Sequence, residues 1–506
     1  MVIKVEDLIK SVENALQHIS YYHSKDFIDA MYLAYKKEKS QAAKDAISQI
    51  LINSRMSAEG RRPICQDTGM VCIFVKMGLG VQLDRNDRSI QDLINEGVKR
   101  AYSNKDNPLR ASMVFPPHGK RINTKDNTPA IIHMDSVVGD KIEIDIAAKG
   151  GGSEFKSKFT VLNPSDSIVD WVIKMLPTMG AGWCPPGIIG IGIGGTAEKS
   201  MLLAKQSLND EIDIHRIIEN GAKNPTEELR LELYNKINDL GIGAQGLGGL
   251  TTVLDVKINE FATHAACKPV ALIPNCAATR HIHFTLSGQG PIDFKSPSLL
   301  DWPKITRVQD SSTLHINLDT ISAKEMTKLK VGQSILLSGK ILTGRDAAHK
   351  RIRDMYKNGQ SLPIDLKNRF IYYVGPVDPV GDEVVGPAGP TTATRMDKFT
   401  DFMLSEIGIS GMIGKSERGP ETIKSIQEHN AIYFMAVGGA AYLISKSIKK
   451  SKVVAFEDLG MEAIYEFEVE NMPVIVAVDG NGESIHFNGP KTWKQKIEDI
   501  KVISSK

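Results

Sequence analysis

Cysteine is the residue type with the most distinctive chemistry in this chain. The five cysteines are Cys65, Cys72, Cys184, Cys267 and Cys276. No two of them form a C-x-x-C pair, which disfavours a zinc ribbon or a thioredoxin-type site. An odd number in a long chain also disfavours a disulfide framework. Taken alone, a free cysteine is most often a small buried apolar residue.

Three of the cysteines stand in loops rich in glycine or proline. Cys65 precedes Gln-Asp-Thr-Gly, Cys184 lies between a tryptophan and two prolines, and Cys276 follows Pro-Asn. Loops on a rigid scaffold are where sites are usually built. Thiolates hold iron–sulfur clusters, and three ligands on a four-iron cube would leave one iron open as a Lewis acid. Spacing alone leaves simple burial open for each of the three. Cys72 lies in the apolar run MVCIFV, which predicts core packing, and Cys267 stays ambiguous.

Basic residues beside glycine-rich turns form a second group. Arg345 stands in TGRDAAHK, Arg395 in GPTTATRMD and Lys415 in GKSERG. The planar arginine fork suits bidentate binding of a carboxylate, so three such cations in one region suit a dianionic substrate. For any one of them a surface or structural role is the default. The histidines open to either acid–base or structural roles are His264, His281 and His283.

The glycine-rich stretches AKGGGSE and GIGIGG invite comparison with phosphate-binding loops. The first lacks Walker spacing, and the second lacks G-x-G-x-x-G followed by a clean helix and a partnering acid. Two other roles remain open. Either the glycines allow main-chain N–H groups to approach an anion such as a carboxylate, or they form tight turns.

The composition is that of an ordinary globular enzyme. The chain has 506 residues, of which 62 are basic and 60 acidic, a net charge of +2. This balance argues against a nucleic-acid partner or a membrane surface. No apolar run approaches the ~18 residues of a transmembrane helix, and the N-terminus lacks the apolar core of a signal peptide. We therefore expect a cytoplasmic protein.

The pattern of apolar residues predicts the α/β class. The first ~60 residues alternate apolar and charged positions at helical spacing. Short apolar strands then alternate with amphipathic helices along most of the chain. The spacing predicts a helix from Ser165 to Leu176, with Ser165 as N-cap. A turn-rich stretch from about Leu286 to Thr306 predicts the domain boundary.

Long motifs of this chain, in order, resemble those of the class I fumarases, the iron–sulfur fumarate hydratases. They are PICQDTG, AKGGGSE, GWCPPG, PNCAATRHIHF, TGRDAAHKRI, YYVGPVDP, DEVVGPAGPTTATRMDKF, MIGKSERGP and AFEDLGMEAIYEF. The resemblance runs from about residue 50 to about residue 490. It implies an N-terminal α/β domain that binds the cluster (residues 1–290), a linker (291–308) and a smaller C-terminal swivelling β/α domain (309–506). It also implies a homodimer, with the active site where the two domains meet.

The resemblance also implies the site residues and their roles. Cys65, Cys184 and Cys276 match the ligands of a 4Fe–4S cluster in which one iron has no cysteine ligand. Cys267 lies outside that ligand pattern. Thr391 is the candidate base, Asp67 the candidate partner for the hydroxyl proton and His264 the fallback base. The residues that match substrate contacts are Gln66, Asp67, Arg110, Gly150, Gly151, Ser153, His264, Arg345, Thr391, Arg395 and Lys415.

The implied activity is the reversible, stereospecific hydration of fumarate to S-malate, a step of the tricarboxylic acid cycle. L-Tartrate dehydratase, or a fumarase/mesaconase of broader specificity, is the alternative, since tartrate dehydratases share many of these motifs. An electron carrier would need four cysteines in a compact motif, and a nucleotide-binding module would need the missing Walker pattern. With the cluster on one domain and the cations on the other, domain closure would complete the site and expel water.

Overall fold

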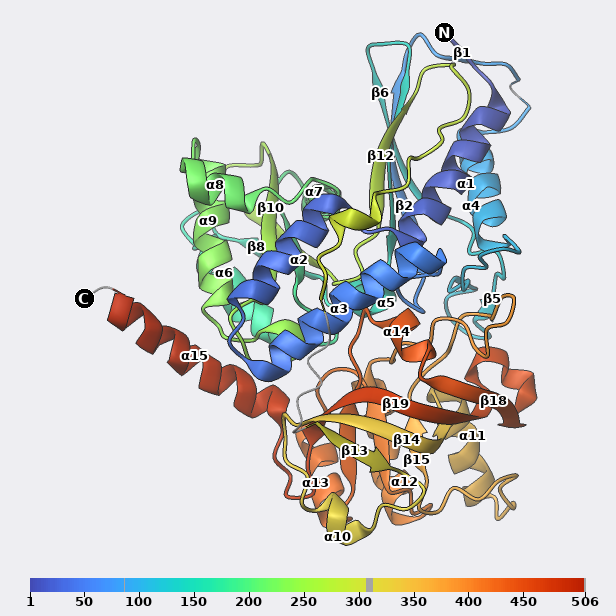
Figure 1. Ribbon diagram of the computed structural model, residues 1–506. Coiled ribbons are helices and arrows are strands. Elements are labelled where there is room, and N and C mark those ends of the chain that lie inside the picture. Colours follow the sequence, from blue (N-terminus) through green and yellow to red (C-terminus); the bar gives the residue numbers. More distant parts are fainter. Residues whose placement is uncertain (86, 306–312, 505–506) are drawn as a thin grey trace.

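A computed structural model of the chain describes residues 1–85, 87–305 and 313–504. Within these residues helices and strands are mixed around three larger sheets, which confirms the α/β prediction. Two four-stranded sheets lie in the N-terminal part, and a seven-stranded sheet lies in the C-terminal part (Figure 1).

The N-terminus is helical, as its periodicity predicts. Its helices are α1 (Val5–Tyr21), α2 (Lys25–Lys37) and α3 (Gln41–Gly60). The apolar face of α1 packs on α4 (Ile90–Tyr102) and on the first sheet. In contrast, α2 and α3 bury their apolar residues in the same core as the C-terminal sheet. The two halves of the chain therefore share one hydrophobic core.

The first four-stranded sheet carries two of the predicted loops at its ends. Its order is β12 (His281–Leu286), β7 (Ile142–Lys149), β2 (Met70–Gly78) and β6 (Ile131–Val137). Strand β7 runs antiparallel to β2, with Lys149 opposite Met70. The end of β7 therefore meets the start of β2. This register places the loop before β2, with Cys65 to Gly69, next to α5 (Gly151–Glu154).

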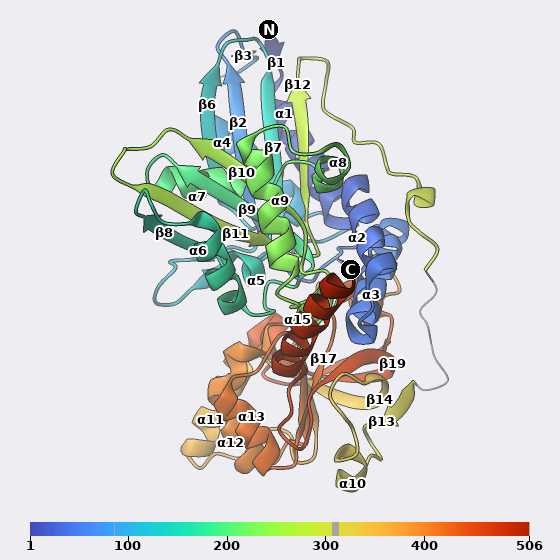
Figure 2. The same ribbon diagram turned by 90° about the vertical axis from the view of Figure 1, so that its left-hand side faces the viewer.

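The second four-stranded sheet brings the other two cysteine loops together. Its order is β10 (Val253–Phe261), β9 (Gly187–Gly194), β11 (Lys268–Asn275) and β8 (Lys158–Leu162). Its helices, visible beside it in Figure 2, are α6 (Ile168–Met175), α7 (Ala197–Ser207), α8 (Ile214–Asn220) and α9 (Pro225–Asn238). The predicted N-cap of α6 is wrong. Ser167 caps this helix by accepting a hydrogen bond from the N–H of Asp170 at 3.1 Å.

The C-terminal sheet closes on itself. Its order is β13 (Leu314–Asn317), β14 (Ser334–Thr343), β15 (Phe370–Tyr372), β16 (Gly411–Gly414), β17 (Ile432–Met435), β19 (Ile464–Val478) and β18 (Ile448–Ala455). Strand β19 pairs with both β17 and β14, which turns the five strands from β14 to β19 into a ring. The helices of this half are α10 (Ala323–Met326), α11 (Asp346–Lys357), α12 (Asp397–Ser405), α13 (Pro420–Glu428) and α14 (Ala441–Ser445).

The last helix, α15 (Ile485–Ser504), returns to the N-terminal half (Figure 1). A Cβ on Gly248 would lie 2.5 Å from the carbonyl carbon of Gly489 in this helix. The segment that follows β12 runs down the right-hand side of Figure 2, from the N-terminal half towards β13. The predicted linker, residues 291–308, ends outside the described residues, and so does the predicted start of the C-terminal domain at 309. The domain boundaries stay a prediction.

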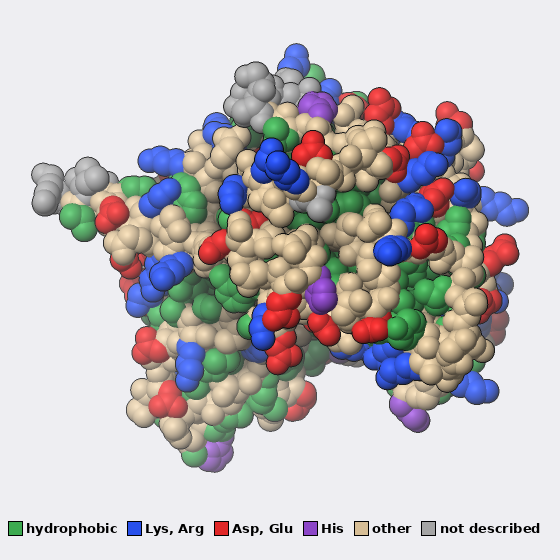
Figure 3. Space-filling view, turned by 90° about the horizontal axis from the view of Figure 1, so that it is seen from below, with side chains coloured by type: hydrophobic (Ala, Val, Ile, Leu, Met, Phe, Trp, Pro, Cys, Tyr) green, Lys and Arg blue, Asp and Glu red, His purple; other side chains and the backbone are tan. Residues whose placement is uncertain are grey.

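The surface seen in Figure 3 carries basic and acidic side chains interspersed, in keeping with the net charge of +2. No helix among residues 1–85, 87–305 and 313–504 is long and apolar enough to span a membrane.

Candidate active site

The structure brings the three loop cysteines Cys65, Cys184 and Cys276 together; we call them the cysteine site. Strands β9 and β11 are antiparallel neighbours with Ile188 opposite Asn275. Cys184, before β9, and Cys276, after β11, therefore lie at the same end of these two strands. The N–H of Ala277 donates to the Cys184 carbonyl at 3.1 Å. Cys65 and Cys276 belong to one small apolar cluster.

Burial and charge set the chemistry of these thiols. Cys65 and Cys184 are buried, at 8% and 4% exposure, and Cys276 is half-buried. Burial raises the pKa of the Cys65 thiol to about 11, against the smaller effects of Arg280 and Lys415. It raises the pKa of Cys184 in the same way. Without a positive partner such thiols stay protonated, so a metal or a cation is needed to hold them as thiolates.

Lys415 supplies a cation at the centre of the cysteine site. Its Nζ donates to the Cys184 Sγ at 3.0 Å. Burial alone would lower the pKa of Lys415, but the sulfur atoms of all three cysteines outweigh it, and the pKa is raised. The ammonium also lies 3.1 Å from where a Cβ on Gly152 would stand, which leaves little room for a side chain in the glycine-rich loop.

Thr391 lies next to Lys415 because their two loops pair. The N–H of Lys415 donates to the Thr391 carbonyl at 3.2 Å, and Thr392 forms a parallel bridge with Lys415. Thr391 is 8% exposed. The motifs GPTTATR and GKSER thus form one surface that faces the cysteine site.

Asp67 is an ionised carboxylate at the rim of the cysteine site. Its Oδ2 accepts from the N–H of Gly151 at 2.9 Å, and its Oδ1 lies 3.9 Å from Nη2 of Arg110. Burial alone would raise the pKa of Asp67, but Arg110, Arg280 and Lys415 outweigh burial and lower it. The glycine-rich loop therefore binds a carboxylate through its main chain, here that of the protein itself.

Two guanidinium groups meet close by. Arg110 donates through Nη1 to the carbonyl of Gly375, and the side chain of Arg345 packs against the same glycine. The Nε atoms of Arg110 and Arg345 are buried and have no hydrogen-bond partner within the described residues. Burial lowers the pKa of Arg345 to about 10; Glu462 opposes this shift, whereas Arg110 and Arg395 add to it. Buried donors left unpaired beside a second cation are a place where a carboxylate would be stabilised.

The remaining predicted contacts are tied to protein groups. Gln66 is buried and donates through Nε2 to the Pro390 carbonyl at 3.1 Å, while its Oε1 accepts from the Cys65 thiol at 3.3 Å. Ser153 accepts from the Nζ of Lys149 at 2.9 Å. Arg395 forms an ion pair with Asp346 and is 40% exposed.

Comparison with known proteins agrees with this arrangement. The family model for fumarate hydratase (Fumerase) matches residues 9–285, and the model for the fumarase C-terminus matches residues 288–489. The anaerobic class I fumarate hydratase of Escherichia coli (strain K12) is 31% identical over 466 residues, which cover 89% of this chain and 84% of that protein. Fumarate hydratase 2 of Leishmania major is 30% identical over 505 residues, which cover 96% and 87%. The chain belongs to the class I fumarate hydratase family.

Another relative covers only one half of this fumarate hydratase family member. The putative L(+)-tartrate dehydratase subunit alpha of Methanocaldococcus jannaschii is 36% identical over 284 residues, 55% of this chain and 96% of that protein. Here both halves lie in one chain, as in the fumarate hydratases that match along most of its length.

The structure does not bring His264 to the cysteine site within one chain. His264 is exposed in the loop between β10 and β11. That loop lies at the opposite end of β11 from Cys276. Eight strand residues span roughly 25 Å. A catalytic role for His264 stays a prediction that this arrangement does not support. Of the other histidines, His283 pairs at the surface with Asp145 at 2.8 Å.

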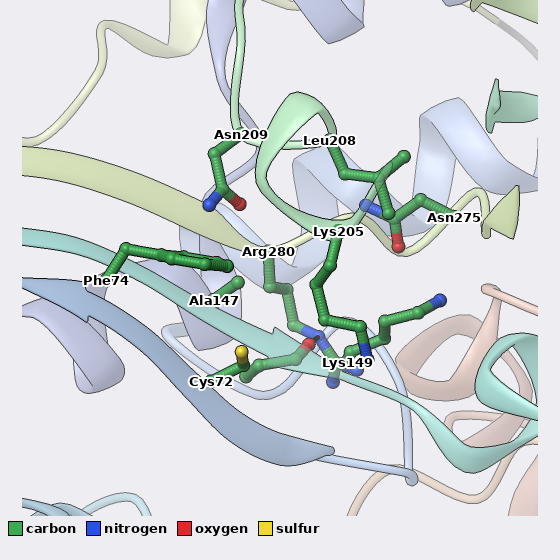
Figure 4. Close-up of a pocket in the computed structure, with 10 residues that line it drawn as sticks. Cys72, Phe74, Ala147, Lys149, Lys205, Leu208, Asn209, Asn275 and Arg280 are labelled. Carbon is green, nitrogen blue, oxygen red and sulfur yellow. Dashed lines mark hydrogen bonds between the residues drawn. The ribbon is translucent and has the colours of Figure 1, made fainter. Parts of the chain in front are cut away.

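Sequence reasoning missed Arg280 and Lys149. Arg280 donates through Nη1 to the Asp67 main-chain carbonyl at 2.6 Å, and Lys149 donates through Nζ to the Pro274 carbonyl at 2.5 Å. Both line a narrow pocket beside Cys72 (Figure 4), which has room for a water molecule but not for a four-carbon diacid. Arg280 lies four residues after Cys276 in PNCAATR, so its place in a cysteine-containing motif is the signal that could have found it.

The donor set fits a cluster better than a single ion. No group of three His, Cys, Asp or Glu side chains in the described parts of the chain is arranged to hold one metal ion. A four-iron cube instead spreads its thiolate ligands around a larger body. Three cysteines from three separate loops, two of them buried, surround one ammonium and meet that demand.

Proposed function

We propose that this chain is a fumarate hydratase, a hydro-lyase that interconverts fumarate and S-malate. The observation that carries the proposal is the meeting of the cysteine site with Arg110 and Arg345, one from each half of the chain, whose buried Nε donors have no hydrogen-bond partner among the described residues. Sulfur ligands alone would suit many iron–sulfur proteins, and arginines alone would suit many carboxylate-binding proteins. Their meeting in one place suits hydration of a dicarboxylate.

Cys65, Cys184 and Cys276 would hold a 4Fe–4S cluster. With one iron lacking a cysteine ligand, the bound cluster supplies a Lewis acid for the hydroxyl and carboxylate oxygens of the substrate. Lys415 stands where it offsets the charge of the thiolates, since its Nζ lies 3.0 Å from the Cys184 Sγ. Lys415 thus serves both the cofactor and the substrate side of the site.

Arg110, Arg345 and Arg395 would bind the substrate carboxylates. The buried Nε atoms of Arg110 and Arg345 have no hydrogen-bond partner in the part of the chain that the structure describes, and they offer directed donors. When a proton leaves the carbon next to a carboxylate, negative charge builds on that carboxylate. Fixed cations stabilise this charge without reorganising, which is the largest contribution to catalysis in many enzymes.

Asp67 and Thr391 are the proposed proton-transfer groups. Arg110, Arg280 and Lys415 lower the pKa of Asp67 despite its burial, so this carboxylate is ionised at neutral pH and can accept a proton from water during hydration. In the reverse direction, dehydration of S-malate, the Thr391 hydroxyl would accept the carbon-bound proton, which in hydration it would return to carbon, and it needs a positive environment to act as a base. The neighbouring Lys415, paired with Thr391 through the main chain, provides it.

Homodimerisation, a cytoplasmic location and a role in the tricarboxylic acid cycle belong to the same proposal and rest on the family resemblance. L-Tartrate dehydratase activity is the second candidate. It is favoured by the 36% identity, over 284 residues, to a putative L(+)-tartrate dehydratase subunit alpha.

A substrate comparison tests the proposal. The protein is reconstituted anaerobically with iron and sulfide, and kcat/KM is measured for fumarate, mesaconate and L-tartrate. We expect fumarate to be preferred, S-malate as product, and activity lost after iron chelation. Preference for L-tartrate would reassign the substrate, and full activity after chelation would refute the cluster-dependent mechanism.

A further inference from the structure

Gln245 links the Cys184 loop to the C-terminal half of the chain. It is 2% exposed, and both its main-chain N–H and its Nε2 donate to the carbonyl of Pro185, at 2.7 and 3.0 Å. Its Oε1 accepts from the N–H of Gly438 at 2.9 Å. One carboxamide therefore connects the residue after Cys184 with a loop of the C-terminal half.

Asn53 does the same for the Cys65 loop. It is fully buried in α3, and its Nδ2 donates to the carbonyls of Ile64 and Gly439, both at 3.0 Å. Its Oδ1 accepts from the N–H groups of Tyr442 and Leu443, at 2.8 and 2.9 Å. Ile64 directly precedes Cys65 in the chain.

Both carboxamides hold the same segment of the C-terminal half, residues 438–443, which we call the support segment. Its main chain lies against the cysteine site. A Cβ on Gly438 would overlap the Cys184 Sγ, so a larger residue there would have to displace the sulfur. The segment carries no residue that either the motifs or the resemblance assigned to the site.

The conformation of Gln245 points to a specific role. Its φ is +54°, in the left-handed region that a non-glycine residue adopts only at a conformational cost. Glycine would remove that cost but also the side chain. The glutamine side chain provides hydrogen bonds to Pro185 and Gly438, and these offset the conformational cost.

We propose that Asn53 and Gln245 are positioning residues that clamp the Cys65 and Cys184 loops onto the support segment. The C-terminal half then helps to retain the cluster in addition to binding substrate. This inference rests on the proposed function, because it assumes that the cysteine site holds a cluster.

A carboxamide is suited to this task because it donates and accepts at once without charge. Replacing it by a carboxylate of the same shape keeps the acceptor and removes the donor. Gln245→Glu would still accept from Gly438 but would set a carboxylate oxygen against the Pro185 carbonyl. Asn53→Asp would do the same towards Ile64 and Gly439. A lost buried hydrogen bond of this kind corresponds to roughly a tenfold change in an equilibrium.

The test is the rate of iron release to a chelator from the anaerobically reconstituted full chain, measured for wild type, Gln245→Glu and Asn53→Asp. We expect release about tenfold faster in both variants. Asn238→Asp is the matched control. Asn238 makes a similar pattern of bonds, to Thr252 at 2.7 Å and to Val253 at 3.0 and 3.3 Å, but within the N-terminal half. It should release iron at the wild-type rate.

Circular dichroism of each apo variant separates positioning from folding. If an Asn53 or Gln245 variant does not fold, Gly438→Ala, which presses on the Cys184 sulfur from the other half, takes its place and should also speed release. Wild-type release rates in folded variants would overturn the inference and leave the proposed function intact. If the wild-type chain takes up no iron and sulfide, the proposed function fails and the inference with it.

Discussion

At the scale of single residues, the site gathers arginines that pair with carboxylates of the protein, as Arg110 does with Asp67 and Arg345 with Glu462, and that still have donor atoms to spare. Arg110 and Arg345 approach one glycine, and their buried Nε atoms have no partner among residues 1–85, 87–305 and 313–504. Such an arrangement costs free energy in the empty protein, which the substrate carboxylates would recover on binding. Substrate affinity and catalysis should therefore depend on these guanidinium groups more than on any neutral contact.

Arg395→Gln should lower kcat for fumarate hydration by about 10²–10³-fold, the typical loss when one group that stabilises transition-state charge is removed. Arg395 stands outside the cysteine site and pairs with Asp346, so the cluster should be retained. Steady-state kinetics and visible absorbance of the reconstituted variant check both parts. The matched control is Arg369→Gln, which removes an arginine that pairs with Glu466 at 2.8 Å. Loss of the cluster in Arg395→Gln would contradict the proposed division of roles.

The sequence indicated the chemistry of many site residues but not which of them lie close together in the folded chain. Cysteines and arginines beside glycine-rich turns are recognisable by type and context. That Lys415 would bond to Cys184 depends on packing between segments 231 residues apart, which no local pattern encodes. The opposite case is His264. The resemblance assigned it to the site, and its sequence neighbourhood gives no hint that its loop lies at the end of β11 away from Cys276.

At the scale of secondary structure elements, the glycines of β9 explain how the Cys184 loop is anchored. A Cβ on Gly190 or Gly192 would overlap the main chain of α7. The helix therefore rests directly on the strand that begins three residues after Cys184. The GIGIGG stretch, which invited a phosphate-loop interpretation, is a buried strand whose glycines allow close helix packing.

Gly192→Ala should lower the free energy of unfolding by about 1–3 kcal/mol or more, the cost of overpacking a buried contact. Urea unfolding of the apo protein measures this change. Gly480→Ala is the control, because a Cβ there meets nothing closer than 3.9 Å and should leave stability nearly unchanged. Equal stability of both variants would contradict the packing role of the β9 glycines.

The start of α8 is held to β10 and α9 by a charged cluster that makes stability depend on pH. Burial alone would raise the pKa of Asp213, but hydrogen bonds from Arg230 and Lys257 lower it to about 2. A lowered folded-state pKa stabilises the protein above the unfolded value of about 3.9, and this contribution is lost as the pH falls towards 2. The difference in unfolding free energy between wild type and Asp213→Asn should be constant above pH ~5 and shrink below pH ~4. A difference that does not vary with pH would contradict this assignment.

The presence of helices and strands was more predictable from the sequence than the residues at which they begin and end. Helical periodicity indicated that the first ~60 residues are helical, and α1, α2 and α3 confirm it; short apolar runs indicated strands that alternate with helices along the rest of the chain. The N-cap of α6 is Ser167 instead of Ser165 because two serines near the helix start satisfy the same local rule, and only the helix geometry selects one. The closing of the C-terminal sheet by β19 follows from pairings distant in sequence and has no local signal.

At the scale of the whole molecule, the site lies where the two halves of the chain meet. Helices α2 and α3 share a core with the C-terminal sheet, and Lys415 of the C-terminal half bonds to Cys184 of the N-terminal half. A site of this kind can be assembled only after both halves have folded and docked. The resemblance to class I fumarases implied this meeting surface, whereas composition and periodicity did not.

The most direct test of the account is the iron and labile sulfide content of the anaerobically reconstituted chain and of single cysteine-to-serine variants. We predict about four iron and four sulfide per wild-type chain. Cys65→Ser, Cys184→Ser and Cys276→Ser should each lose most of both. Cys72→Ser, at a cysteine buried in β2 outside the cysteine site, should keep them. A full cluster in any of the first three variants, or its loss in Cys72→Ser, would contradict the assignment of the cysteine site.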